Sequence, residues 1–484
     1  MSVVELTSYV AGEWRAGAET IEDRNPARPS EVVAEVRAAD PALAEDAASA
    51  AAEAFAGWRD TPSPARGDVL RRAADLLERR AEEVGRDLAR EEGKTFVEAV
   101  GETARAVAIL RYYAGQTLEP DGETYPSHSA STFLYARREP LGPVAAITPW
   151  NFPIAIPAWK LAPALAYGNT VVWKPAELVP LTSVHLARAL ADAGLPPGVL
   201  NLVLGRSADV GETVVGHDAV AAITFTGSNE VGRRIQLTAT ARGKKVQLEL
   251  GGKNPAIVLA DADLEQAAEQ VARGAFLSAG QKCTATSRVI VESSVLAEFA
   301  ERLVDRARSW KVGDPLDPDT TVGPLASEAQ LARVSHYLDV AKEEGATPLA
   351  GADGPAGDGY YVRPTVLGDV APESPVAREE IFGPVAALLE ASSYEDAVAQ
   401  ANDTPFGLTA SLFTRDLGRA LRFAREARAG VVKVNQETAG LELQAPFGGT
   451  KQSSSGSREQ GKVARDFFTE WKTVYVDPPT GGAV

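Results

Sequence analysis

The sequence predicts an α/β protein that is built on parallel sheets and divided into more than one domain. Short apolar runs alternate with segments of helical periodicity in two long blocks, which is the pattern of repeated βαβ units. The length of 484 residues exceeds what one compact core holds, so two or three domains are expected. Hydrophobic residues at 45% and charged residues at 24% are ordinary globular values, so most of the chain should fold.

The chain from Pro41 to about Gly115 is predicted to be helical. Three segments carry apolar residues at helical spacing with charged opposite faces, namely Pro41–Trp58, Ala65–Glu91 and Phe96–Ala114. Each segment is long enough to form a stable helix once its apolar face packs against a sheet or a neighbouring helix.

The first alternating block follows these helices. Its strands are expected at 141–148, 169–175, 199–203 and 220–225, and a helix should follow each of them, near 153–167, 182–193, 207–216 and 228–241. Because the strands are short, apolar and separated by helices, they should lie parallel in one sheet.

A second alternating block runs from about Pro255 to Asn435, and the boundary is expected near Leu250–Gly252, where a pair of glycines separates two apolar runs. Two stretches, Thr132–Glu139 and Glu470–Val476, fit neither block and have the character of lone strands that could pair with another subunit. The strands expected in the second block are PAIVLA, RVIVE, PVAALLE, TASLFT and GVVKVN.

Charge and composition exclude several classes of partner. A net charge of −17 argues against nucleic acid or an anionic membrane, although the start of a helix can still bind a phosphate locally. The longest apolar runs, such as 141–149, are too short to span a bilayer, and the N-terminus lacks a secretory pattern, so a cytoplasmic location is expected. The single cysteine and four scattered histidines predict neither a disulfide nor a metal site.

The single cysteine, Cys283, lies in the segment FLSAGQKCTATSR (276–288). A lone cysteine is often a buried structural thiol. Here, however, a glycine and several small polar residues surround it, which is typical of a tight loop between a helix and a strand. A thiolate in such a loop can attack a carbonyl carbon if its pKa is lowered or its proton is removed.

Two polar residues are candidates to assist the thiol. Glu249 ends a strand-like run just before two glycines. It is either a solvated carboxylate at the end of a strand or a base that activates water once a drier site raises its pKa. Asn151, in TPWNFP (148–153), is expected to begin a helix after a strand. Its amide either caps that helix or points at a developing oxyanion.

The usual dinucleotide fingerprint, G-x-G-x-x-G after a strand, is missing from this sequence. The segment FTGSNEVG (225–232) instead places Gly227 and Ser228 between a strand and a helix. Ser228 is predicted to cap that helix, whose free N–H groups would face an anion. The segment KPAE (174–177) adds a lysine and a carboxylate at the end of another strand.

Taken together, these segments resemble the aldehyde dehydrogenase superfamily, and the resemblance runs from NPARPSEVV (25–33) to KTVYV (472–476). Seven motifs of the family occur in family order: TPWNFP, KPAE, FTGS, LELGGKNP, GQKCTATSR, EEIFGP (379–384) and PFGGTKQS (446–453). A chance origin for seven ordered motifs is not credible.

The resemblance implies a role for each matching residue. The implied catalytic residues are Cys283 as nucleophile, Glu249 as general base, and Asn151 as oxyanion donor together with the N–H of Cys283. The implied cofactor residues are Lys174 and Glu177 at the adenosine ribose, Gly227 and Ser228 near the pyrophosphate, Trp150, Asn151 and Leu250 along the cofactor, Glu380 at the nicotinamide ribose and Phe382 beside the ring.

The resemblance also implies the architecture. It implies a Rossmann-like cofactor-binding domain over residues 1–120 and 142–250, a catalytic α/β domain over 251–440, and a small β oligomerisation ribbon over 121–141 and 465–484. It implies a homodimer or homotetramer and a small-molecule aldehyde substrate. The cofactor is NAD or NADP, and NAD should be favoured because the carboxylate of Glu177 repels a 2′-phosphate.

One segment departs from the usual family pattern. The loop SSSGSREQG (453–461) is one residue longer than the family's compact form and resembles the bacterial branch that oxidises α-ketoglutarate semialdehyde (2,5-dioxopentanoate). Trp159 stands where dehydrogenases for succinate semialdehyde commonly carry an arginine for the distal carboxylate. Lys282 either supplies that cation here or points to solvent.

The expected reaction is oxidation of an aldehyde to a carboxylic acid through a thiohemiacetal and a thioester on Cys283. One alternative substrate class is another aliphatic or aromatic aldehyde. A CoA-acylating enzyme is disfavoured because such enzymes typically lack the glutamate found here as Glu249. A catalytically silent structural protein on the same fold is disfavoured by the intact catalytic set.

Overall fold

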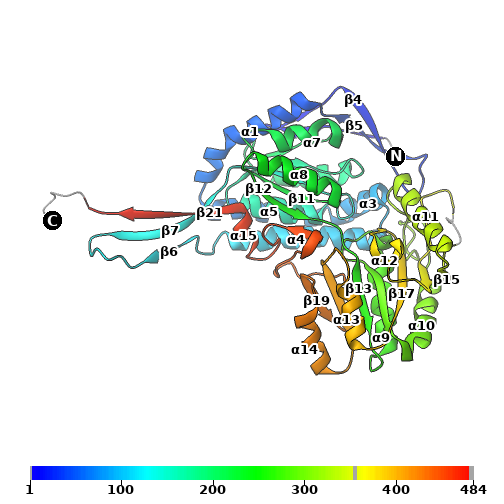
Figure 1. Cartoon of the computed structure of the whole chain (residues 1–484). Helices are drawn as coiled ribbons and strands as arrows, with labels where there is room; N and C mark the ends of the chain where they lie inside the picture. The colour runs from blue at the N-terminus through cyan, green and yellow to red at the C-terminus, as the bar shows by residue number, and fades with distance from the viewer. Residues whose placement is uncertain (1–2, 353–356, 479–484) are drawn as a thin grey trace.

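The computed structural model describes residues 3–352 and 357–478. Parts of the expected domain ranges, at residues 1–2, 353–356 and 479–484, lie outside the described residues. Within the described chain, two large sheets lie side by side, and a narrow three-stranded ribbon projects from one side of the molecule (Figure 1). A second three-stranded sheet, β1 (Val4–Leu6), β4 (Glu19–Arg24) and β5 (Val32–Ala38), lies on the N-terminal side.

The first large sheet has a parallel centre, as the sequence predicts. Its order is β20-β12-β11-β8-β9-β10-β2-β3, and β12, β11, β8, β9 and β10 run parallel. The central strands are β8 (Pro143–Ile147), β9 (Thr170–Lys174), β10 (Leu200–Leu202), β11 (Ala222–Thr226) and β12 (Lys245–Glu249); the edges are β2 (Ser8–Val10), β3 (Glu13–Arg15) and β20 (Ser454–Ser455). The helices between the central strands are α5 (Ala155–Ala166), α6 (Pro180–Asp192), α7 (Ser207–Gly216) and α8 (Asn229–Ala241). All four predicted strand–helix pairs are therefore confirmed.

The N-terminal helices are α1 (Pro41–Asp60), α2 (Ser63–Arg79), α3 (Ala81–Glu92) and α4 (Phe96–Gln116). The prediction of one helix over Ala65–Glu91 is wrong, because the chain leaves helical geometry at Arg80, where φ is −106° and ψ is 11°. No glycine or proline marks this position, so the local sequence carries no signal for the break. It lets α2 and α3 each pack separately against α4 and α6.

The second large sheet has the order β15-β16-β17-β14-β13-β18-β19. Its strands are β13 (Asn254–Val258), β14 (Thr286–Glu292), β15 (Thr347–Ala350), β16 (Thr365–Gly368), β17 (Val385–Ala391), β18 (Thr409–Phe413) and β19 (Val431–Val434). All five predicted strands are confirmed, whereas the strands β15 and β16 at one edge were not predicted. The helices around this sheet are α9 (Leu264–Phe276), α10 (Leu296–Ser309), α11 (Glu328–Glu343), α12 (Pro375–Arg378), α13 (Tyr394–Asn402) and α14 (Leu417–Glu426).

The ribbon contains the two stretches that fitted neither block. Its order is β21-β7-β6, with β6 (Gly122–Tyr125), β7 (Phe133–Pro140) and β21 (Thr469–Val476), and α15 (Ala464–Phe468) leads into β21. The predicted strands are confirmed, and in this chain they pair with each other, antiparallel, from Thr469 opposite Pro140 to Val476 opposite Phe133.

The short connection between the two large sheets brings the end of a strand in the first sheet close to the start of a strand in the second. Strand β12 ends at Glu249 in the first sheet, and β13 begins at Asn254 in the second, so only four residues separate them. Apolar clusters fill the space between each sheet and its helices, and burial of that surface is the main stabilising contribution of the fold. Among the helices of the described residues, none combines the length and the apolar character that a membrane crossing requires.

Candidate active site

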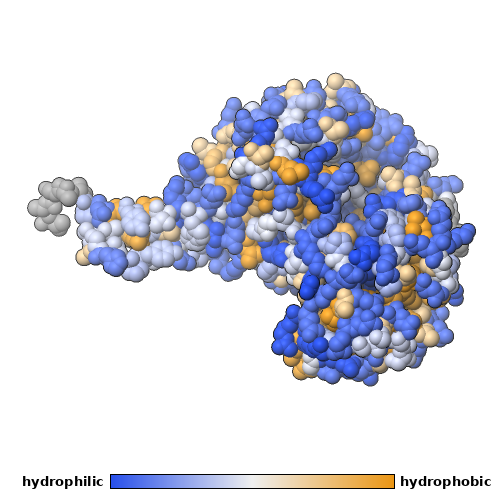
Figure 2. All heavy atoms as spheres, in the orientation of Figure 1, coloured by the Kyte–Doolittle hydropathy of each residue, from blue (hydrophilic) through white to orange (hydrophobic). Residues whose placement is uncertain are grey.

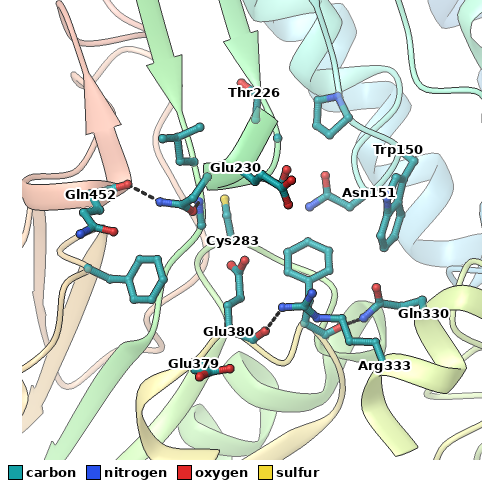
Figure 3. Close-up of a pocket in the computed structure, with 18 of the residues that line it drawn as sticks. Trp150, Asn151, Thr226, Glu230, Cys283, Gln330, Arg333, Glu379, Glu380 and Gln452 are labelled. Atoms are coloured by element: carbon teal, nitrogen blue, oxygen red, sulfur yellow. Dashed lines mark hydrogen bonds between the residues drawn. The ribbon is translucent and has the colours of Figure 1, made fainter. Parts of the chain in front are cut away.

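A cavity of about 490 Å³ lies where the two sheets meet and receives residues from both (Figure 3). Most of the predicted site residues line it: Trp150, Asn151, Gly227, Ser228, Leu250, Cys283, Glu380 and Phe382. Three other predicted residues, Lys174, Glu177 and Glu249, are not among the residues that line it. The structure thus gathers into one place residues that are more than 200 positions apart in the sequence.

The loop that carries Cys283 has an unusual backbone. Three consecutive residues before it adopt the left-handed conformation, Ser278 (φ 55°), Ala279 (φ 50°) and Gly280 (φ 67°). That conformation costs about 1–2 kcal/mol for each residue with a side chain. A Cβ on Gly280 would lie 2.2 Å from the carbonyl oxygen of Gly383, so no other residue fits. The sequence predicted a tight loop here, and the loop is both tight and strained.

The thiol of Cys283 borders the cavity and is otherwise surrounded by protein. Burial raises its pKa to about 12, and the carboxylates of Glu380 and Glu249 add to this effect by repelling a thiolate. At neutral pH the sulfur is therefore a thiol, and a nucleophilic attack requires either a base or a nearby positive charge.

The sequence had suggested that Asn151 begins a helix, but in the structure it does not. Helix α5 starts at Ala155 and the capping position is Ile154, so the reading of Asn151 as a helix cap is wrong. Its side-chain Nδ2 instead donates a hydrogen bond to the carbonyl of Gln281 at 2.9 Å. Figure 3 shows the amide pointing toward Cys283 across the cavity. One of the two amide hydrogens is engaged by Gln281, which leaves the other for a negatively charged oxygen near the sulfur.

Glu249 ends strand β12, as predicted, but it is not a solvated carboxylate, because only 2% of the residue is exposed. Its Oε2 accepts a hydrogen bond of 2.6 Å from the hydroxyl of Ser454 in β20, and no described residue bonds its Oε1. Burial raises the pKa of Glu249 well above its usual value, and the nearby carboxylate of Glu459 raises it further. A carboxyl group whose pKa is raised in this way is a stronger base, once ionised, than an exposed glutamate.

Three polar residues near Glu249 were not singled out from the sequence as catalytic candidates: Ser454, Glu459 and Lys160. The ammonium of Lys160, in α5, pairs with Glu459 and donates to the hydroxyl of Thr224 at 2.9 Å. The available signals were a lysine within the otherwise apolar segment AIPAWKLAPALA and a glutamate in the loop 453–461. Those signals suggest buried charge, yet they do not reveal that Glu249 lies beside it.

Glu380 and Phe382 line the opposite wall of the cavity. The Oε1 of Glu380 accepts a hydrogen bond of 2.9 Å from the N–H of Gly252, and burial raises the pKa of this carboxyl. Gly251 allows the approach, since a Cβ there would lie 2.5 Å from Glu380 Oε2. Phe382 has a left-handed backbone (φ 62°), and its ring centroid lies 5.4 Å from that of Trp150 in an edge-to-face arrangement.

The start of α8 forms the third wall. The hydroxyl of Ser228 accepts a hydrogen bond from the N–H of Val231 at 3.4 Å, so the predicted cap is confirmed. The hydroxyl of Thr226, just before Gly227, is buried, and no described residue bonds it. A cavity with a helix start, an unbonded hydroxyl and two aromatic rings fits a nicotinamide dinucleotide, whose pyrophosphate is bound well by a helix N-terminus.

Lys174 is the last residue of β9, and Glu177 lies in the segment that follows it. The ammonium of Lys174 donates to Ser207 Oγ at 2.8 Å, while Glu177 Oε1 accepts from the N–H of Ser207 at 2.6 Å. Their charged groups are 3.9 Å apart, and burial lowers the pKa of Lys174 to about 8. The side chain of Glu177 is 39% exposed, so its carboxylate remains accessible to a ligand.

Lys282, next to the nucleophile, does not point to solvent. It is buried, and its ammonium donates to the carbonyl of Arg273 at 3.1 Å. Burial lowers its pKa. The reading of Lys282 as a solvated lysine is therefore wrong, and it is not one of the residues that line the main cavity.

Comparisons with known proteins agree with this geometry. The model of the aldehyde dehydrogenase family matches residues 14–474. The chain is 50% identical over 477 residues to an alpha-ketoglutaric semialdehyde dehydrogenase of Bacillus subtilis, covering 97% of this chain and 98% of the relative. It is 48% identical over 475 residues to an alpha-ketoglutarate semialdehyde dehydrogenase of Haloferax volcanii, with 97% and 98% covered. A crystal structure of betaine aldehyde dehydrogenase from Staphylococcus aureus in complex with NAD+ superimposes with a TM-score of 0.95 at 34% identity, covering 99% of this chain and 96% of that one.

Proposed function

Since the chain belongs to the aldehyde dehydrogenase family, we propose that its substrate is a semialdehyde, namely α-ketoglutarate semialdehyde (2,5-dioxopentanoate). The chain is an oxidoreductase that acts on an aldehyde group with NAD or NADP. The observation that carries the proposal is that two relatives named for this substrate match nearly the whole chain at 50% and 48% identity. The loop 453–461, which resembles the same branch, supports it from the sequence.

The proposed mechanism assigns one role to each catalytic residue. Cys283 attacks the aldehyde carbon after its proton passes to solvent, and the aldehyde oxygen becomes the oxyanion of a thiohemiacetal. The side-chain amide of Asn151 and the N–H of Cys283 stabilise the oxyanion of the thiohemiacetal. When bound, a nicotinamide dinucleotide would supply the acceptor for the hydride that leaves the thiohemiacetal carbon, and that loss leaves a thioester on Cys283. Glu249 then removes a proton from water, and the resulting hydroxide releases the carboxylic acid from the Cys283 thioester.

The proposed cofactor contacts follow the walls of the cavity. Glu380 would accept hydrogen bonds from the nicotinamide ribose, and Phe382, Trp150 and Leu250 would enclose the nicotinamide half. Gly227 and Ser228 would contact the pyrophosphate, where the positive end of the α8 dipole favours anions. Lys174 and Glu177 would contact the adenosine ribose at the edge of the sheet.

We also propose that the protein is a homo-oligomer that associates through the ribbon. Tyr475 is 68% exposed, Phe133 56%, Trp471 48% and Tyr125 44%. In Figure 2 a few hydrophobic residues lie among the mostly pale residues of the projecting ribbon, and its edge strands β6 and β21 leave backbone groups free to pair. Exposed apolar side chains on strands with open edges are typical of an interface. Light scattering after size exclusion should therefore give the mass of two or four chains.

The substrate proposal is tested by kcat/KM over a panel of aldehydes, measured from the absorbance of the reduced cofactor. The panel contains α-ketoglutarate semialdehyde, succinate semialdehyde, pentanal, betaine aldehyde and benzaldehyde. The highest kcat/KM is expected for α-ketoglutarate semialdehyde. A tenfold higher value for betaine aldehyde or benzaldehyde would contradict the assigned substrate, while the assignment as an aldehyde dehydrogenase would stand.

A further inference from the structure

A group of buried and half-buried ionisable side chains surrounds the start of helix α4 and has no part in the mechanism above. Lys94 and Glu102 are both buried, and the Nζ of Lys94 lies 2.5 Å from a carboxylate oxygen of Glu102. Glu98, one turn before Glu102, belongs to the capping box with Thr95 that begins the helix. Buried charges are costly unless they are paired and hydrogen-bonded, so their contacts indicate what they hold in place.

The Lys94–Glu102 pair holds the segment that carries Asn151. The ammonium of Lys94 donates to the backbone carbonyl of Asn151 at 2.7 Å. Glu102 Oε1 accepts from the N–H groups of Ile154 at 3.0 Å and Ala155 at 3.1 Å, where α5 begins. One ion pair thus fixes both ends of the turn from Asn151 to Ala155. The same ammonium lies 4.0 Å from the centre of the Phe152 ring, which restrains the middle of that turn.

Glu98 holds the strained loop that leads to the nucleophile. Its Oε1 accepts from both the N–H and the hydroxyl of Ser278, at 2.8 and 3.0 Å. Its Oε2 accepts from the N–H and hydroxyl of Thr95, at 3.1 and 2.9 Å, so the carboxylate cannot rotate freely. Ser278 is the first of the three left-handed residues. The hydrogen bonds that Ser278 donates to Glu98 therefore fix the point where the strained backbone begins.

The two restrained segments meet at the reaction centre. The amide of Asn151 donates to the carbonyl of Gln281, two residues before Cys283. The oxyanion donor and the nucleophile are therefore joined to each other and, through Lys94 and Glu98, to one helix end. A displacement of either segment would change the distance between sulfur and amide, on which stabilisation of the oxyanion depends.

We propose that Lys94 and Glu98 are positioning residues for the dehydrogenase reaction, Lys94 for the oxyanion donor Asn151 and Glu98 for the loop of Cys283. Neither side chain needs to touch the substrate, since each acts through backbone groups of the segment that it holds. The inference rests on the proposed roles of Asn151 and Cys283.

The first test is Lys94→Met, which removes the ammonium and keeps a similar volume. Two rates are measured separately: the pre-steady-state burst of reduced cofactor, which requires the oxyanion donor, and alkylation of Cys283, the only thiol, by iodoacetamide in cofactor-free protein. The burst rate should fall by about 100-fold, as a misplaced catalytic group predicts. The alkylation rate should stay within threefold of the wild type, because the nucleophile loop keeps its contact with Glu98.

Lys94→Met leaves the buried carboxyl groups of Glu102 and Glu92, which lie 2.5 and 3.9 Å from the ammonium in the wild type, without their cation. The double variant Lys94→Met/Glu102→Gln is therefore made alongside it to allow folding. The glutamine keeps a carbonyl oxygen for the N–H groups at the start of α5 and removes the charge of Glu102, while burial raises the pKa of Glu92 to about 8, so that Glu92 can stay protonated. Lys244→Met is the matched control, since the Lys244 ammonium also donates to backbone carbonyls, those of Val215 and His217, away from the cavity. The control should leave both rates unchanged. A folded double variant whose burst rate lies within threefold of the wild type would overturn the role of Lys94.

The second test compares Glu98→Ala with Glu98→Gln. Glutamine keeps one oxygen that can accept from Ser278, whereas alanine keeps none. Both the alkylation rate and the burst rate should fall by at least tenfold in the alanine variant and recover in large part in the glutamine variant. Equal rates in the alanine variant and the wild type would refute the role of Glu98. If Asn151→Ala itself left the burst rate unchanged, the proposed mechanism would fail, and that result is distinct from failure of the positioning proposal.

Discussion

At the scale of single residues, the thiol of Cys283 is the group on which the proposed chemistry depends. Cys283→Ala should abolish dehydrogenase turnover, because no other thiol exists in the chain to form the thiohemiacetal. Binding of NAD, measured by calorimetry, should remain nearly unchanged, since the other lining residues of the cavity are intact. Turnover within tenfold of the wild type would show that Cys283 is not the nucleophile.

The raised pKa of Glu249 gives a pH prediction with a definite sign. The carboxyl group acts as a base only when it is ionised, so thioester hydrolysis should accelerate as the pH rises through the pKa of Glu249. Burial raises that pKa well above the usual value of a glutamate. Single-turnover kinetics between pH 5.5 and 9 measure this limb directly. Glu249→Gln should still release a burst of reduced cofactor and then stall at the thioester.

Two other outcomes would change the assignment of Glu249. A glutamine variant with neither burst nor turnover would place the residue in activation of Cys283 instead. Normal steady-state turnover of that variant at every pH would remove Glu249 from the mechanism.

Cofactor preference depends on the carboxylate of Glu177. We expect a higher kcat/KM with NAD than with NADP, with NADP still used, because a carboxylate at the ribose repels a 2′-phosphate while Lys174 partly offsets the repulsion. Glu177→Ser should raise kcat/KM with NADP and narrow or reverse the preference. A wild type that strongly prefers NADP, or an unchanged ratio in the variant, would mean that Glu177 does not select the cofactor.

Some residues of this site could be predicted from the sequence, and others could not. Cys283 and Glu249 could be identified because each stands in a short motif whose neighbours indicate a loop or a strand end. The Lys160–Glu459 pair could not, because 299 positions separate its members and neither motif indicates the contact. The suggestion that Asn151 begins a helix failed for a local reason: three further residues of turn, held by Glu102, precede α5.

At the scale of the elements, the short strand β20 delivers Ser454 to the proposed base. β20 pairs with the end of β12, with Ser454 opposite Glu249. The Ser454 hydroxyl lowers the pKa of Glu249 by donating to its ionised form. Ser454→Ala should therefore move the rising limb of the pH profile to higher pH, by up to about one unit, from the ~0.5–1.5 kcal/mol of a hydrogen bond. An unchanged limb, with Ser457→Ala as the control, would show that this bond does not tune the base.

Elements were predicted well where their own residues decide the structure. The central strands form where apolar runs are buried on both faces of a parallel sheet, and such runs are visible in the sequence. The break at Arg80 and the strands β15 and β16 were not predicted, because packing against other segments decides them. β15, for example, contains a proline and is only four residues long.

At the scale of the whole molecule, the exposed ribbon should control association. Tyr475→Asp places a charge on the ribbon at a residue that is 68% exposed in the single chain. If the ribbon is the interface, burying that charge is unfavourable and the variant should elute as a smaller species in size exclusion with light scattering. Val4→Asp, which alters an exposed apolar residue in β1, outside the ribbon, is the control and should keep the wild-type mass. An unchanged mass for both variants would place the interface elsewhere.

The architecture of the whole chain could be predicted from the order of its segments along the sequence, and no single segment predicted it alone. Alternation of strands and helices predicted two parallel sheets, and the structure has them. The domain ranges as functional units and the number of chains in the assembly stay predictions, because they depend on contacts that lie beyond one chain.

The position of Cys283 also has a consequence for oxidative damage. Met1 and Cys283 are the only residues of the chain that contain sulfur. Because burial keeps the sulfur of Cys283 in its thiol form, peroxide should react slowly with the resting protein. Once a sulfenic acid forms, no second cysteine of the same chain can capture it as a disulfide. Its repair then depends on a small external thiol that can enter the cavity, and without one oxidation proceeds to the irreversible sulfinic acid.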